Sequence, residues 1–128
     1  MAKNFSFYPF LVFLQGILER MQILVLSGTD ACCGPMAAAF LRDYSPSIEV
    51  VSAGSHPLDS VDPMAVAVMK ECLIDLSDYR PKTITDFDLS AFDEVYECPD
   101  FPGEKTIDAY RKMRDFVKNE AYLFFRGL

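Results

Sequence analysis

Between positions 22 and 39 the chain reads QILVLSGTDACCGPMAAA: a short apolar run, a loop of small residues and a helix opened by proline. The branched apolar residues over 22–26 predict a buried strand. Pro35 suits the first helical position, because its missing N–H would have no partner there, and a helix is predicted over 36–44. A strand, a loop and a helix in this order are typical of an α/β fold.

The loop between this strand and this helix has the composition of an anion-binding site. Its amides could point inward, and a helix N-terminus carries about half a positive charge. The alternative is a polar loop that joins the two elements without any ligand. The residues of the candidate site are Ser27, Gly28, Thr29, Asp30, Ala31, Cys32, Cys33 and Gly34.

The same stretch resembles the phosphate loop of the low-molecular-weight protein tyrosine phosphatases and the related thioredoxin-coupled arsenate reductases. In that family a cysteine is followed by five residues, an arginine, a Ser or Thr, and Pro-Met-Ala. Residues 35–37 match this Pro-Met-Ala, which places Ser27 on the nucleophilic cysteine and Cys33 on the arginine. Gly34 falls on the hydroxyl residue, and Cys32 falls on a second cysteine that many members have.

The family's chemistry depends on two side chains that this loop lacks. A thiolate is the nucleophile, and an arginine forks onto two oxyanion oxygens. Ser27 has no comparable anionic fraction at neutral pH, and no base is visible near it in sequence. We therefore expect a degenerate member that hydrolyses aryl phosphates and reduces arsenate no faster than background. The alternatives are an active enzyme of this family that uses Cys32 or Cys33, and a structural or interaction module.

The resemblance implies that the ligand is an oxyanion such as phosphate or sulfate, or a phosphorylated protein. The missing arginine removes charge-assisted hydrogen bonds worth roughly 1.5–3 kcal/mol each. Asp30 adds a carboxylate where the family usually has asparagine, and Tyr79 stands where it has histidine. We expect millimolar binding at best, strengthened by Asp30→Asn, with Arg80 and Lys82 as the cations that could offset the loss.

The rest of the chain continues the alternation of strands and helices. Leu73 replaces a glycine that the family has after its second helix, which predicts a different cap. We expect a three-layer α/β fold with a parallel sheet of three or four strands and right-handed crossovers. Compared with the family, an internal segment before the last helix is missing. The further strands are predicted at 48–52 and 92–98, and the further helices at 63–72, opened by Asp62 as N-cap, and at 105–125.

Two residues that follow the third predicted strand are also candidates. Asp100 is the nearest match to the family's general acid, which protonates the leaving oxygen. Pro99 precedes it and Phe101 follows it, so the family's Asp-Pro pattern is broken, and a turn-forming aspartate is the alternative. Cys98 lies near the place where arsenate reductases keep a resolving cysteine, but its expected partner on a redox helix is missing, so we interpret it as a buried structural thiol.

Charge and cysteine content restrict the partners. The net charge of −7 argues against nucleic acid and against anionic membrane surfaces. Cys32, Cys33, Cys72 and Cys98 have no metal-ligand spacing, and His56 is the single histidine. We therefore expect no metal and no cofactor, and four reduced cysteines in a cytoplasmic protein.

Residues 1–20 are interpreted as a partly ordered extension before a domain over 21–128. The alternatives are a stretch that comes from an upstream start codon and is not native to the fold, and a helix over 9–20 that packs on the domain or on a partner. Their apolar run at 5–14 is too short to cross a bilayer, and no membrane association is expected. Oligomer or partner contacts are predicted through residues 1–20 or through the aromatic end of the last helix.

Overall fold

A computed structural model describes residues 20–101 and 103–128, and in this part of the chain three parallel strands form one sheet. β1 (Met21–Ser27) is the middle strand, with β2 (Ile48–Gly54) on one side and β3 (Glu94–Glu97) on the other. Three of the residues of β1, Ile23, Leu24 and Val25, are fully buried. The predicted parallel α/β sheet is confirmed with three strands, and the prediction about residues 1–20 falls almost wholly outside the described residues.

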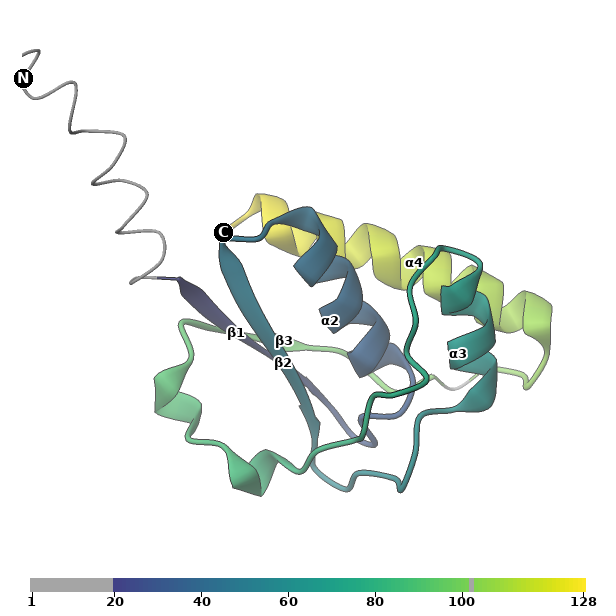
Figure 1. Cartoon of the computed structure of the whole chain (residues 1–128), viewed down its shortest axis with the longest axis horizontal. Coiled ribbons are helices and arrows are strands. Elements are labelled where there is room, and N and C mark those ends of the chain that lie inside the picture. The colour runs from purple at the N-terminus through teal and green to yellow at the C-terminus, as the bar shows by residue number, and fades with distance from the viewer. Residues whose placement is uncertain (1–19, 102) are drawn as a thin grey trace, which may run out of the picture.

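Three helices pack together against the strands, as Figure 1 shows: α2 (Cys33–Tyr44), α3 (Pro63–Lys70) and α4 (Ile107–Arg126). The connection from α3 to β3 contains two 3-10 turns, Ile84–Asp86 and Leu89–Ala91, which lie away from these helices in the same view. None of the described helices is both long and apolar enough to cross a membrane.

The helix after β1 begins earlier than the sequence predicts. It starts at Cys33 rather than near Pro35, so Cys33 and Gly34 belong to the helix and not to the loop. The amide of Met36 donates to the carbonyl of Cys32, which closes the first turn. Because the first four N–H groups of a helix have no intrahelical partner, proline is tolerated within this turn and does not mark its first residue.

The other boundaries shift for local reasons. β2 is longer than predicted, because its pairing with β1 continues to Gly54. β3 is shorter than the predicted 92–98, because its register with β1 covers only four residues. The last helix begins at Ile107 rather than at 105, because the Thr106 side chain accepts from the amide of Ala109 and caps it.

The second predicted helix has the expected start. The carboxylate of Asp62 accepts from the amide of Met64, and Pro63 is the first helical residue. The helix ends at Lys70 and not at 72. The chain then makes a further turn in which Ile74 N donates to Met69 O and Leu73 N donates to Lys70 O, the hydrogen-bond pattern of a Schellman motif.

Leu73 occupies the left-handed position of this motif, with a φ of 63°, and is 96% exposed. A leucine pays a steric penalty there that glycine avoids, and its side chain buries almost nothing in return. We expect Leu73→Gly to raise the free energy of unfolding by about 0.5–1 kcal/mol, measured by urea denaturation. Leu58→Gly is the control, because Leu58 is 55% exposed and is not in the left-handed region. Equal effects at both positions would contradict this explanation.

Candidate functional site

The loop after β1 is held by its carbonyl groups, which point outward to residues 55–62. The carbonyl and the N–H of one trans peptide point in opposite directions. The amides of residues 28, 29, 30 and 32 therefore face the other side, as an anion cradle requires. The four bonds run from Ser55 N to Ser27 O (3.1 Å), His56 N to Gly28 O (2.8 Å), Leu58 N to Thr29 O (3.0 Å) and Asp62 N to Ala31 O (2.8 Å).

Ser27 lies within this cradle and is buried. Its Oγ accepts a hydrogen bond from the amide of Asp30 at 3.1 Å, so one inward N–H already has a partner within the loop. A Cβ on Gly34 would lie 2.6 Å from that Oγ, so the glycine leaves room for the hydroxyl. No side chain caps the N-terminus of α2, and its partial positive charge stays available to a ligand.

Asp30 is placed differently from the sequence expectation. Its side chain is fully buried, and its Oδ2 accepts from the Tyr79 hydroxyl at 2.5 Å and from Lys82 N at 2.9 Å. Burial raises the pKa of the carboxyl, and the bond from Tyr79 opposes this shift. Oδ1 is buried without a hydrogen-bond partner. The carboxyl therefore anchors the loop in the protein interior.

The two basic residues predicted to help an anion do not line the mouth of the cradle. The pocket at the mouth has a volume of about 480 Å³. Arg80 and Lys82 are both exposed, and Lys82 Nζ lies 4.3 Å from the centre of the Tyr79 ring. The residues that line the pocket are Leu26, Ser27, Gly28, Ser55, Glu97, Cys98, Pro99 and Asp100.

Asp100 reaches the loop despite the broken Asp-Pro pattern. Its Oδ1 accepts from Thr29 N at 3.3 Å and from Thr29 Oγ1 at 3.2 Å. A Cβ on Gly28 would lie 2.1 Å from Asp100 Oδ2 and 2.9 Å from His56 Cε1, so both side chains close over this glycine. Sequence reasoning missed His56 as a site residue. The available signal was that His56 lies in the segment directly after the Ser-Ala-Gly that ends β2.

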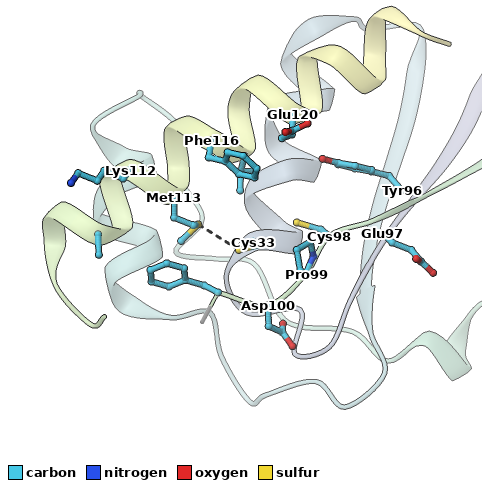
Figure 2. A pocket seen from close by; sticks show the side chains of 13 residues that line it. Cys33, Tyr96, Glu97, Cys98, Pro99, Asp100, Lys112, Met113, Phe116 and Glu120 are labelled. Atoms are coloured by element: carbon cyan, nitrogen blue, oxygen red, sulfur yellow. Dashed lines mark hydrogen bonds between the residues drawn. The ribbon is translucent and has the colours of Figure 1, made fainter. Parts of the chain in front are cut away.

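Neither loop cysteine lines the mouth of the cradle. Cys33 lines a second pocket, between β3 and α4, and its Sγ donates to Met113 Sδ at 3.5 Å (Figure 2). Cys32 is buried, and its hydrogen bond with Cys33 and its burial raise the pKa of its thiol. Cys98 lines both pockets. Within 20–101 and 103–128 no group of three or more His, Cys, Asp or Glu side chains is arranged to hold a metal ion.

A parallel sheet with a loop and a helix N-terminus at the carboxyl end of its middle strand is the arrangement of α/β proteins whose ligand sites lie at that edge of the sheet. The family model described as "Low molecular weight phosphotyrosine protein phosphatase" matches residues 22–98. The chain therefore belongs to the low-molecular-weight phosphotyrosine protein phosphatase family.

Individual relatives agree with this assignment. The chain is 42% identical over 65 residues to "Probable low molecular weight protein-tyrosine-phosphatase EpsP" of Ralstonia solanacearum. This match covers 49% of the chain and 45% of the relative, so it spans less than half of that protein's length.

Two solved structures share the fold. An arsenate reductase in the phosphate-binding state superposes with a TM-score of 0.74 at 19% identity, covering 84% of this chain and 98% of the other. A cysteine-to-serine mutant of the YwlE arginine phosphatase, with a phosphorylated active-site serine, gives a TM-score of 0.74 at 19% identity, covering 84% and 95%.

The burial of the Asp30 carboxyl leads to a prediction about how the free energy of unfolding depends on pH. Because burial raises its folded-state pKa, the ionised form destabilises the fold above that pKa, and the cost disappears as the pH falls below the ordinary aspartate range. We expect Asp30→Asn to raise the free energy of unfolding by about 1 kcal/mol at pH 7 and to have little effect near pH 3.5.

Denaturation at both pH values measures this difference. Asp59→Asn, at an exposed position, is the matched control and should show no such pH dependence. A destabilisation by Asp30→Asn at pH 7 would mean that the bonds from Tyr79 and Lys82 to the ionised carboxylate outweigh the effect of burial.

Proposed function

We propose that this protein binds a phosphoryl group or a similar oxyanion in the loop 27–34 and does not catalyse ordinary turnover. The observation that carries the proposal is the set of outward carbonyls, because it leaves the amides of residues 28, 29, 30 and 32 facing the cradle. Backbone amides and a helix N-terminus bind anions without help from the missing cysteine and arginine. The physiological form of the ligand is a phosphorylated protein or free phosphate.

Asp100 makes this binding weak. Its carboxylate accepts the amide and the hydroxyl of Thr29, so it already occupies part of the position that an oxyanion would take. An incoming anion has to displace it or lie beside a like charge. The loss of the arginine removes the strongest cationic partner as well. Millimolar affinity for inorganic phosphate follows from both effects.

Ser27 is the residue that would meet the phosphorus atom. Its hydroxyl lies at the position of the family's nucleophile and has no thiolate character. In the YwlE mutant the serine at the active site is phosphorylated. By analogy, Ser27 can accept a phosphoryl group from a reactive donor, and the missing arginine and thiolate leave both its formation and its hydrolysis slow.

A second candidate is residual phosphatase activity of the family type. The observation that favours it is the position of Asp100, which stands at the mouth of the cradle where a general acid would act. His56 lies next to it over Gly28 and could assist a proton transfer. This candidate requires Ser27 to be the nucleophile, because neither Cys32 nor Cys33 lines the mouth.

Titration with phosphate tests the cradle. We expect chemical-shift changes in the amides of residues 28–34 with a millimolar Kd. Asp100→Asn should tighten binding about five-fold, because removing a like charge at about 4 Å is worth about 1 kcal/mol in water. Asp43→Asn, at the far end of α2, removes the same charge and should leave the Kd unchanged. The absence of any shift at tens of millimolar phosphate would show that the loop is only a turn.

An assay with an aryl phosphate separates the two candidates. We expect hydrolysis at the background rate, together with slow phosphorylation of Ser27 by an acyl phosphate, seen by mass spectrometry and absent in Ser27→Ala. If turnover exceeds background and Ser27→Ala abolishes it, the residual phosphatase is the correct candidate and the binding proposal is wrong. Turnover that Cys32→Ser or Cys33→Ser abolishes would show that a loop cysteine acts despite its position.

A further inference from the structure

An apolar pocket of about 660 Å³ lies beside the cradle, between the end of β3 and α4 (Figure 2). Its exposed walls are mostly apolar and come from side chains that include Tyr96, Phe101, Met113 and Phe116. Four charged residues also line it: Glu97, Asp100, Lys112 and Glu120. Two cysteines from different elements, Cys33 and Cys98, also line it. Neither the proposed anion binding nor the residual phosphatase candidate uses these two thiols, although Asp100 lines this pocket as well as the mouth of the cradle.

The backbone brings the two thiols together. Cys33 is the first residue of α2, and Cys98 follows β3, with its amide donating to Leu26 O at 2.8 Å. Both side chains line the same pocket, and Cys33 Sγ donates to Met113 Sδ at 3.5 Å. Because both residues line the pocket, a small apolar molecule in it would lie against their side chains although each residue is buried.

The two thiols differ chemically. Hydrogen bonds from Cys32 and Cys98 lower the pKa of Cys33, and its place in the first turn of α2 acts in the same direction. The bond with Cys33 and burial raise the pKa of Cys98. A thiol that ionises readily next to a thiol that stays protonated is the arrangement in which one sulfur reacts with an oxidant and the other then resolves the product.

We propose that Cys33 and Cys98 form an oxidisable dithiol site whose co-substrate is a hydroperoxide that carries an apolar organic group. The apolar walls would bind the organic group and place the peroxide against Cys33. This pair is distinct from the cysteines of the family's phosphate loop, because Cys33 stands at the position of the arginine. The inference does not rest on the anion-binding function.

The reaction balances in two steps. The Cys33 thiolate attacks the terminal peroxide oxygen, the O–O bond breaks, and the alkoxide leaves and takes a proton from water to become an alcohol. Cys33 is then a sulfenic acid. The Cys98 sulfur attacks the Cys33 sulfur, the S–O bond breaks, and the departing hydroxide takes the Cys98 proton and leaves as water. The two thiols supply the two electrons that reduce the peroxide.

Peptide mapping after treatment with cumene hydroperoxide tests the linkage. Trypsin releases Cys33 in peptide 21–42 and Cys98 in peptide 83–105, and Cys32 shares the first peptide. In the full chain that carries Cys32→Ser, Cys33 is the single cysteine of peptide 21–42, so a disulfide between the two peptides must join Cys33 to Cys98. We expect a disulfide between the two peptides that dithiothreitol reverses. A mapped Cys32–Cys33 disulfide in the wild type, or oxidation that stops at a Cys33 sulfinic acid, would overturn the proposal.

A trapping experiment assigns the roles. We expect Cys98→Ser to accumulate a sulfenic acid on Cys33 that dimedone labels, and Cys33→Ser to give no dimedone adduct on Cys98. Cys72→Ser is the control variant, because Cys72 lines neither pocket, and it should form the disulfide like the wild type. Circular dichroism verifies that each variant is folded. Labelling of Cys98 by dimedone in Cys33→Ser would show that Cys98 reacts with the peroxide, which contradicts the proposed roles.

The choice of peroxide tests the pocket. Rates with cumene hydroperoxide and with hydrogen peroxide are each divided by the rate of free cysteine with the same oxidant. We expect the normalised ratio to favour cumene hydroperoxide at least ten-fold, and Met113→Lys, which places a charge in the pocket wall, to abolish the preference. A ratio near one in the wild type would show that the apolar pocket does not bind the oxidant.

Discussion

The hydrogen bonds between the loop 27–31 and the segment 55–62 are the constraint on which the candidate site depends. Parallel pairing of β1 with β2 ends at Ser27 and Gly54. The segments that follow the two strands then run side by side, and the loop carbonyls accept hydrogen bonds from amides of the segment after β2. Each such bond fixes one peptide plane and with it the direction of the next amide. The direction of these amides is therefore a property of the backbone and does not depend on the side chains of the loop.

Asp30 completes this constraint from inside the protein. Its backbone is left-handed, with a φ of 49°, and its side chain is bonded to Tyr79 and to the backbone of Lys82. The hydroxyl of Tyr79 also lies 2.6 Å from Ser52 Oγ, in the adjacent strand β2. The substitutions of aspartate for asparagine and of tyrosine for histidine thus form one bonded pair. We infer that the pair holds the loop and does not determine the charge at its mouth.

The fold was predictable because its signals are local: the apolar run of β1, the Asp62–Pro63 start of α3 and the helical period of α4 all depend on neighbours in sequence. Helix starts were off by two residues where a cap, such as Thr106, decides the boundary. Site geometry was less predictable, because it depends on residues far apart in the chain. The burial of Asp30, the contact of Asp100 with Thr29 and the turn of Cys33 away from the cradle each follow from tertiary packing.

The change at position 33 affects both sites in opposite ways. An arginine there would have been able to reach an oxyanion in the cradle, but the shorter cysteine side chain contacts Met113 and lines the neighbouring apolar pocket instead. The cradle thereby loses a charge that only a long, forked side chain can supply. The pocket gains a sulfur atom beside Cys98, at the helix terminus that favours a thiolate. In the two proposals, the residue at position 33 therefore weakens the polar site and supplies the chemistry of the apolar one.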